Sequence, residues 1–342
     1  MFCLLMSAST SGRLRGLLSR LGIDWFLLGL LGAVALAYAF PELGSKASPL
    51  PWHRMTSAGI SLIFFFYGLR LSPEKLRAGM RNWRLHVLIQ ATTFLVFPLL
   101  ALAVHPLFGT SETSQLLWQS IFFLCTLPST VSTSVVMVSM AGGNIPAAIF
   151  NATLSGLLGI VATPLWTGLV LHTATGNAAL SSLALDLLVQ VVLPVLAGVV
   201  LHRWLGAFAE RHRLRLRTSD QVIILLLVFT SFSESFAQGI FHSYGLLDVL
   251  WLAAGMLGLF LLVFGGIGLL SRALHLPRPD QLTALFCGSK KSLVHGSVMA
   301  AILFPNMAAT GALLLPLMLY HALQILAASV LAQRAARQES VT

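Results

Sequence analysis

Charged residues are scarce in this sequence. Only 9% of its 342 residues are Asp, Glu, Lys or Arg, whereas 57% are hydrophobic. A soluble domain carries roughly 25% charged residues, so the shortage excludes a soluble globular protein. Because the hydrophobic residues lie in long runs, the composition predicts an all-α integral membrane protein.

Cysteine is also rare. Cys3, Cys125 and Cys287 have no paired spacing, and two of them lie inside apolar runs. This pattern argues against a disulfide framework and against a zinc site. The sequence shows no nucleophile–base pair, metal-binding motif or phosphate loop, so we expect neither an enzyme nor a bound cofactor.

Acidic residues are outnumbered by basic ones, with 11 acids against 21 lysines and arginines and a net charge of +10. The bases occur in short clusters between apolar runs, which is typical of the cytoplasmic loops of a membrane protein. We therefore expect the lipid bilayer, and no nucleic acid, as a partner. The apolar stretch 2–6 is too short to be the core of a signal peptide.

The apolar runs predict ten membrane-spanning helices, each near the ~20 residues that a crossing needs. They cover residues 23–40, 55–71, 85–104, 116–140, 145–171, 180–201, 221–241, 246–270, 281–304 and 311–332. Basic segments follow the second and sixth spans, at 72–84 and 203–220. We expect both segments to form interfacial helices on the anionic cytoplasmic leaflet.

The basic residues predict which side of the membrane each loop faces. With the N-terminus inside, 17 of the 21 bases fall on the cytoplasmic side, namely Arg13, Arg15, Arg20, Arg70, Lys75, Arg77, Arg81, Arg84, Arg203, Arg211, Arg213, Arg215, Arg217, Arg272, Arg278, Arg334 and Arg337. Lys46 and Arg54 fall outside. The positive-inside rule then predicts a multi-pass protein of the cell (inner) membrane with both termini cytoplasmic.

An inverted repeat is the predicted organisation. Ten spans divide at the linker 173–179 into two groups of five, and an odd number makes the second group enter from the opposite side. The predicted parts are a cytoplasmic N-terminus 1–22, a first repeat 23–171, a second repeat 180–332 and a cytoplasmic tail 333–342. The fourth helix of each repeat is interrupted, which is a sequence mark of a transport site.

The fourth span is interrupted at its centre. Pro128 removes a backbone donor and clashes with the preceding turn, so we expect the helix to break there. Hydroxyl side chains follow the proline, at Ser129, Thr130, Ser132, Thr133 and Ser134. Two interpretations are open: the segment lines a substrate or ion site, or it is a kinked helix whose hydroxyls bond back to its own carbonyls.

Two adjacent lysines, Lys290 and Lys291, stand in the ninth span. A lysine near the bilayer centre costs ~2.5–3.5 kcal/mol on insertion scales, so the pair calls for a function. Neighbours on a helix point ~100° apart, so only one of them need face a given cavity. The ammonium is either an anion-binding charge or a fixed substitute for a coupling cation. The alternative interpretation places both lysines in a cytoplasmic hairpin after a short re-entrant segment.

Four further polar residues lie in predicted spans. Gln90 either supplies an oxygen to a cation or links two helices. Glu234 is the acid most clearly inside a span, and is a candidate for an ion pair with a lysine or for a proton carrier; exposure at the outer surface is the alternative. His295 and His321 lack metal-ligand spacing, so we interpret both as packing or hydrogen-bonding residues.

The chain resembles the bile acid:sodium symporter family, in the branch of the sodium/bile acid cotransporter 7-like proteins. The matching stretches are FFFYG at 64–68, NWRLH at 82–86, LPST at 127–130, SMAGGN at 139–144, FCGSKKSL at 286–293 and LPLM at 315–318 with His321. The resemblance implies a core domain (85–171 and 246–332) that moves against a panel domain (23–71 and 180–241). It also implies that the fourth and ninth helices are unwound and cross at the centre of the core.

The same resemblance implies a cation site. Carried over by position, its residues are Gln90, Thr133, Ser134, Asn151 and Ser155. The chain departs from the family at 288–292, where the sequence GSKKS replaces an acidic residue and a Gln-Asn pair. No anionic sodium ligand remains in that stretch. We therefore expect at most one coupling sodium ion (Na⁺), and coupling to protons or to no ion is the alternative.

The sequence predicts a secondary active transporter of a small organic anion, working by alternating access. The candidate substrate-binding residues are Pro128, Ser129, Thr130, Ser132, Lys290, Lys291, Ser292 and His295. The alternative function is a non-transporting membrane regulator or sensor that keeps the transporter fold. Polar residues at both interruptions favour transport, because an abandoned cavity tends to fill with apolar side chains.

Overall fold

The computed structural model describes residues 25–71, 82–171, 188–243, 245–304 and 309–339. Within these ranges every regular element is a helix and there is no strand, which confirms the all-α prediction for this part of the chain. The α-helices are α2 (Trp25–Ala39), α3 (Pro41–Gly44), α4 (Trp52–Leu69), α6 (Trp83–Ala91), α7 (Phe97–Ala103), α8 (Glu112–Thr126), α9 (Ser132–Met140), α10 (Ile145–Leu171), α12 (Leu193–Arg211), α13 (Arg213–Ala237), α14 (Leu246–Ala273), α15 (Arg278–Gly288), α16 (Leu293–Leu303) and α17 (Thr310–Glu339).

Six helical stretches of the described chain are long and apolar enough to cross a membrane: Trp83–Leu107, Ile145–Leu171, Leu188–Arg211, Arg213–Ala237, Leu246–Ala273 and Thr310–Arg337. They correspond to the third, fifth, sixth, seventh, eighth and tenth predicted spans. The fourth and ninth predicted spans are each split into two shorter helices, α8 with α9 and α15 with α16. The protein is therefore a multi-pass membrane protein, and the inverted-repeat arrangement stays a prediction.

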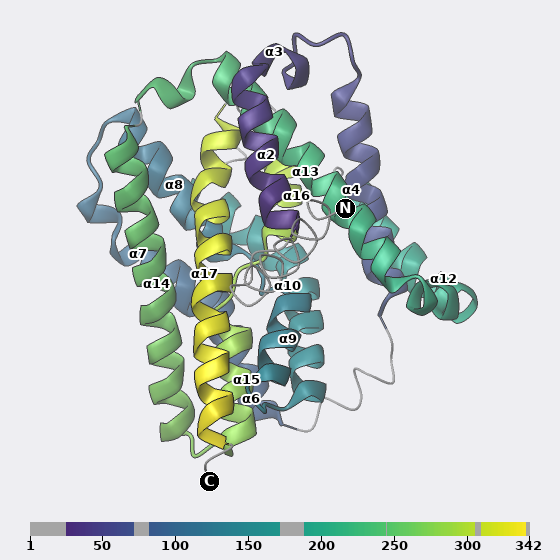
Figure 1. The fold of residues 1–342 in the computed structure, drawn as a ribbon, viewed down its shortest axis with the longest axis vertical. Helices are drawn as coiled ribbons and strands as arrows, with labels where there is room; N and C mark the ends of the chain where they lie inside the picture. Colours follow the sequence, from purple (N-terminus) through teal and green to yellow (C-terminus); the bar gives the residue numbers. More distant parts are fainter. Residues whose placement is uncertain (1–24, 72–81, 172–187, 244, 305–308, 340–342) are drawn as a thin grey trace, which may run out of the picture.

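Figure 1 shows the long helix α17 running through the middle of the molecule, with α14 beside it. Helix α17 also packs against α8, α13 and α16, so it contacts both split spans. Helix α12 packs against α4 and projects from the side of the molecule, while α13 packs against α2, α3 and α4. The split spans thus lie on the central helix, where side chains and main chain are removed from lipid.

The predicted interfacial helix at 203–220 is wrong. Helix α12 runs on to Arg211 and α13 begins at Arg213, so His212 alone separates two long helices. The reason is local: residues 207–237 contain neither proline nor glycine, so the chain stays helical on both sides of His212, whose carbonyl accepts from the Leu216 amide at the start of α13. Of the other predicted segment, 72–84, residues 72–81 lie outside the described chain, and Asn82 caps α6 by accepting from the Leu85 amide.

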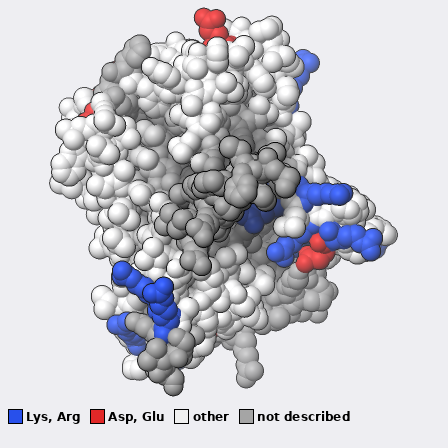
Figure 2. Space-filling model, in the orientation of Figure 1, with Lys and Arg blue, Asp and Glu red and all other residues white. Residues whose placement is uncertain are grey.

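Most of the basic side chains visible in Figure 2 lie in two groups, and a smaller patch lies at the upper right. One group lies over the α12–α13 junction and the other at the end of the molecule where α14 ends and α15 begins. The exposed arginines at these places are Arg203, Arg211, Arg213 and Arg215 on α12 and α13, Arg272 on α14, Arg278 on α15, and Arg334 and Arg337 near the C-terminal end of α17. The clustering fits the predicted sidedness, although which side is cytoplasmic stays a prediction.

Candidate functional site at the two broken helices

The first break separates α8 from α9 and leaves residues 127–131 without helical structure. Leu127 is extended, with φ −72° and ψ 152°, as a residue before proline prefers. Pro128 cannot donate to the preceding turn, so α8 ends at Thr126. The break predicted at Pro128 is confirmed.

The second break separates α15 from α16 at residues 289–292. No proline lies in it. Ser292 takes the N-cap position of α16, and its hydroxyl accepts from the His295 amide at 3.3 Å. A serine at this position satisfies an amide that the start of a helix leaves free, so it favours a new helix beginning at Leu293.

The two breaks are joined by hydrogen bonds to main-chain carbonyls. The Ser292 amide donates to the Pro128 carbonyl at 2.9 Å, and the Ser129 hydroxyl donates to the Cys287 carbonyl at 2.6 Å. On α10, Gly159 permits the close approach of Pro128, because a Cβ there would lie 2.7 Å from the proline Cγ. Freed backbone groups in a membrane must be satisfied by protein, and here each break satisfies part of the other.

Both lysines of the second break are fully buried, with 0% of their surface exposed. The alternative interpretation, a solvent-exposed hairpin, is therefore wrong. The Lys291 Nζ donates to three main-chain carbonyls, those of Thr93 at 2.8 Å, Cys125 at 2.6 Å and Leu127 at 2.8 Å. It also lies 4.1 Å from the centre of the Phe97 ring, whose face attracts a cation.

The carbonyls of Cys125 and Leu127 are available because α8 ends between them. In a continuous helix they would accept from the amides four residues further on, at 129 and 131. The Ser129 amide instead donates to the Ser155 hydroxyl at 2.9 Å. Two acceptors at the carboxyl end of α8 are thereby left for the lysine.

The Thr93 carbonyl is available for a different reason. Residues Thr92–Val96 form a π-helical turn between α6 and α7. The Phe97 amide donates to the Thr92 carbonyl, and residue 98 is a proline, which has no N–H. The amides of residues 97 and 98 are therefore not available to the Thr93 carbonyl, and this oxygen accepts from the Lys291 ammonium instead.

Helix α17 holds the main chain of the second break. The Gln324 side chain accepts from the Lys291 amide at 2.9 Å and donates to the Lys291 carbonyl at 2.8 Å. The Tyr320 hydroxyl donates to the Ser289 carbonyl at 2.7 Å. Sequence reasoning missed Gln324, Tyr320 and Thr93. Only Gln324 carried a signal, since an amide inside an apolar span needs partners, as argued above for Gln90.

Lys290 has a different environment. Among the described residues, the Thr133 carbonyl, at 3.0 Å, is the single hydrogen-bond acceptor of its Nζ. The Phe286 ring centre lies 6.0 Å away. The nearby hydroxyls of Thr130, Thr133 and Ser134 bond to one another, at 2.7 Å and 2.9 Å. An ammonium has three N–H donors, so Lys290 keeps donor capacity that Lys291 has used. The Ser132 side chain lies outside what the structure describes.

The proposed cation ligands fall into separate groups. Gln90 on α6 donates to the carbonyl and the side-chain oxygen of Asn151 on α10, at 3.1 Å and 3.3 Å, so it does link two helices. Asn151 in turn contacts His86 Nδ1 at 2.9 Å. The Gln90 Oε1 is buried and has no partner in the described chain. Ser155 instead holds the Ser129 amide, and a cation role for these residues stays a prediction.

His295 lies where α16 meets α4. Its Nδ1 is 3.0 Å from the Ser292 hydroxyl, and its ring packs edge-on against Tyr67 and Phe64. The Tyr67 hydroxyl donates to the Thr153 carbonyl of α10 at 2.7 Å. His295 therefore lies at the boundary between the predicted panel and core domains, next to the second break. His321 instead contacts Gln324 and Phe26.

Glu234 lies at the far end of α13, away from the breaks. It accepts from the Lys46 backbone amide at 2.8 Å and from Gln238 at 3.2 Å. It lines a cleft of about 290 Å³ together with residues of α4, α13 and α16, including Trp52 and Ala301. Its described partners are a loop amide and a neighbouring side chain, which favours the surface alternative; its role as a proton carrier stays a prediction.

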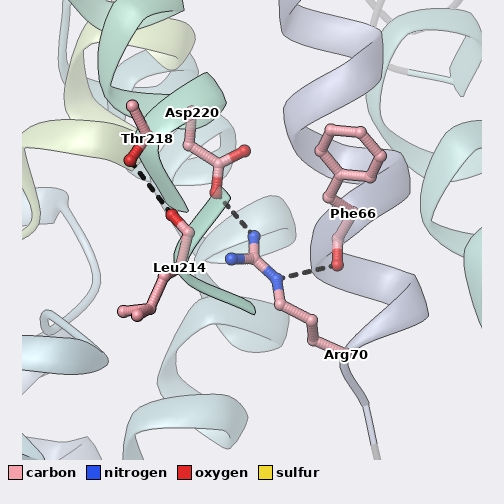
Figure 3. A network of polar contacts seen from close by, with 5 residues as sticks. All are labelled: Phe66, Arg70, Leu214, Thr218 and Asp220. Carbon is pink, nitrogen blue, oxygen red and sulfur yellow. Dashed lines mark hydrogen bonds and ion pairs between the residues drawn. The ribbon is translucent and has the colours of Figure 1, made fainter. Parts of the chain in front are cut away.

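An ion pair ties α4 to α13 at the opposite end of these helices (Figure 3). The Arg70 guanidinium lies 2.7 Å from the Asp220 carboxylate and also donates to the Phe66 carbonyl at 2.9 Å. Asp220 is buried, and its second oxygen has no partner in the described chain. This contact lies within the predicted panel domain and fixes its helices to each other.

Two split helices that meet inside a multi-pass bundle, around buried ammonium groups, define the architecture of a membrane transporter. Comparison with known proteins agrees. Residues 24–337 match the model of the SBF-like CPA transporter family, so the chain belongs to this family.

Three relatives illustrate how far the similarity extends. The chain is 43% identical to uncharacterized protein PA2026 of Pseudomonas aeruginosa over 319 residues, covering 92% of this chain and 93% of the relative. It is 36% identical to "Putative symporter YfeH" of Escherichia coli over 316 residues, covering 92% and 94%. It is 29% identical to sodium/bile acid cotransporter 7 of Xenopus tropicalis over 320 residues, covering 92% of each chain.

Proposed function

We propose that this protein is a secondary active transporter of a small organic anion that works by alternating access. The observation that carries the proposal is the Lys290 ammonium, fully buried at the contact between the two broken helices with one described acceptor. A buried charge that protein groups do not saturate is costly, so its retention favours a ligand of opposite charge. The names of the relatives, a symporter and a sodium/bile acid cotransporter, support transport for this chain.

Within the second break, the candidate substrate-binding residues reduce to Lys290 and the residues that follow Lys291. The Lys291 ammonium and the Ser129 hydroxyl already have short hydrogen bonds to main-chain carbonyls. The remaining polar candidates of the second break are Lys290, whose ammonium lies at the Thr133 carbonyl of α9, and Ser292 and His295, which lie where α16 meets α4. We infer that the anionic group of the substrate binds Lys290 while its remainder lies against His295.

Access to this site requires the molecule to open, since both lysines are buried. The cleft between α4, α13 and α16 reaches Ala301, six residues beyond His295 on the same helix. Six helical residues span ~9 Å, so the cleft ends about two turns from the proposed site. In our proposal, movement of the panel helices α4 and α13 against α16 extends this cleft to Lys290.

Sodium enters the proposal as the candidate coupling ion, with at most one site. A sodium ion close beside a lysine ammonium meets repulsion on the order of 4 kcal/mol at 4 Å with an effective dielectric of 20. The region of Gln90 and Asn151 on α6 and α10 is the remaining candidate, because the Gln90 Oε1 is buried without a partner in the described chain. The protein is proposed to lie in the cell (inner) membrane with both termini cytoplasmic.

The experiment is a thermal-shift screen of the purified protein against a panel of organic anions, followed by uptake into proteoliposomes. A ligand at 100 times its Kd stabilises the folded state by about 2.7 kcal/mol, which a melting curve resolves. Lys290→Gln should abolish the stabilisation and the uptake. Arg215→Gln, which removes the same charge from an exposed position on α13, is the matched control and should change neither.

A hit that stabilises Lys290→Gln as much as the wild type would contradict the assigned site. A chain that binds organic anions but never moves them across the proteoliposome membrane would contradict transport. That second outcome would instead support the regulator or sensor.

A further inference from the structure

The Lys291 ammonium lies in a cage of main-chain oxygens. Carbonyls of Thr93, Cys125 and Leu127 surround its Nζ at 2.6–2.8 Å, and the Phe97 ring faces it at 4.1 Å. Neutral carbonyl oxygens with an aromatic face are the groups that bind a monovalent cation. We infer that this cage is a monovalent-cation site that the chain fills permanently with its own lysine, as a tethered cation.

The number of acceptors defines the charge of the lysine. Three carbonyl oxygens each need a donor, and only the –NH₃⁺ form of lysine offers three N–H groups. A neutral amine would leave one carbonyl unsatisfied inside the membrane. The geometry therefore assigns a full positive charge to this position.

The cage is made by the backbone and does not depend on the lysine. One of its oxygens, that of Cys125, belongs to the last turn of α8, where the unsatisfied carbonyls carry the negative end of the helix dipole, and another belongs to Leu127, the extended residue that follows this helix. The third is exposed by Pro98 and the π-helical turn at Thr92–Val96. Without Lys291 these oxygens would still converge, and a free cation is the ligand that they fit.

The lysine cannot leave this cage during a transport cycle. Its amide and carbonyl are both bonded to Gln324 of α17, and its side chain reaches two elements far away in the sequence. A free ion would bind and dissociate with the substrate, whereas this charge stays with the fold. For the proposed transport function, the inference means that the lysine takes the place of one coupling ion. The inference itself rests only on the geometry of the cage.

The first test removes the lysine and supplies free cations. Lys291→Ala and the matched control Lys290→Ala each remove one buried lysine charge, but only the first empties the cage. Each purified variant and the wild type are melted in sodium, potassium and choline chloride at equal ionic strength. We expect sodium or potassium to raise the melting temperature of Lys291→Ala by several degrees relative to choline. This gain should exceed the salt-specific shift of both the wild type and Lys290→Ala. No excess gain would overturn the inference.

A second test uses the wild type, so it stands even if Lys291→Ala does not fold. Reductive methylation with formaldehyde and a borane reductant, read by peptide mass spectrometry, reports which amines become accessible. Lys46, which is exposed, should react first; Lys290 should react slowly as the site opens; Lys291 should stay unmodified. Methylation of Lys291 at the rate of Lys290 would overturn the tethered cation. Neither test contains an organic anion, so failure here leaves the proposed transport intact, and failure to find a substrate leaves this inference intact.

Discussion

Gln324 positions the second break. Replacing it by leucine tests how much its two hydrogen bonds to Lys291 contribute to the stability of the protein. In the wild type its side chain satisfies both the amide and the carbonyl of Lys291, at 2.9 Å and 2.8 Å, and it is fully buried. Leucine keeps a similar volume but offers neither an acceptor nor a donor. Both main-chain groups would then be unsatisfied in a water-free environment.

Two magnitudes compete in this prediction. Interhelical side-chain hydrogen bonds in membrane proteins average roughly 0.6 kcal/mol, because the unfolded state in the membrane also finds partners. An unsatisfied buried backbone group costs about 1–3 kcal/mol, so two of them cost about 2–6 kcal/mol. We expect the larger figure to hold, because Lys291 is anchored at its ammonium as well and its main chain cannot turn toward new partners.

The assay is thermal unfolding in detergent, followed with a thiol-reactive dye. Cys125 and Cys287 are both buried, so they react only when the bundle opens. A Cys3→Ser background removes the third thiol, which lies outside the described residues. Gln119→Leu, at a half-buried position of α8, is the matched control and should melt like the wild type.

The outcome that would refute the reasoning is a Gln324→Leu protein that melts within error of Gln119→Leu. The lysine main chain would then have found other partners, and Gln324 would not be a positioning residue. A large loss of stability together with an unchanged Lys291 methylation pattern would show that the cage holds the ammonium without the help of α17.

Two further predictions concern packing and the panel domain. Gly159→Ala should destabilise the protein by about 1–3 kcal/mol, because its Cβ would press on Pro128, whereas Gly168→Ala on the same helix meets nothing within 4 Å and should be neutral in the same melt. Asp220→Asn should lower the free energy of unfolding by less than the ~3–5 kcal/mol expected when a fully buried ion pair is broken, because the Arg70 side chain is 26% exposed. Adding Arg70→Gln to this variant should lower the stability little further, because the pair is already broken. Equal melting of the two alanine variants, or additive losses in the Asp220 and Arg70 cycle, would contradict these readings.

The sequence alone determined the class of protein and the places where helices break. A charged fraction of 9% and apolar runs near ~20 residues exclude a soluble fold. Pro128 ends a helix by removing a donor, which is a local effect that needs no tertiary information. The separate interfacial helix predicted at 203–220 is wrong for another local reason: residues 207–220 contain neither proline nor glycine, so the segment continues the helices on either side of His212.

Only the tertiary structure decided which lysine does what. Lys290 and Lys291 are adjacent and have the same type of side chain. Their positions in the sequence do not indicate toward which helix each side chain points. The partners of Lys291 lie 198, 166 and 164 residues away, and they are main-chain oxygens that any residue type supplies. Because a carbonyl cage has no side-chain signature, the folded backbone alone distinguishes a caged ammonium from one that is free to hold a ligand.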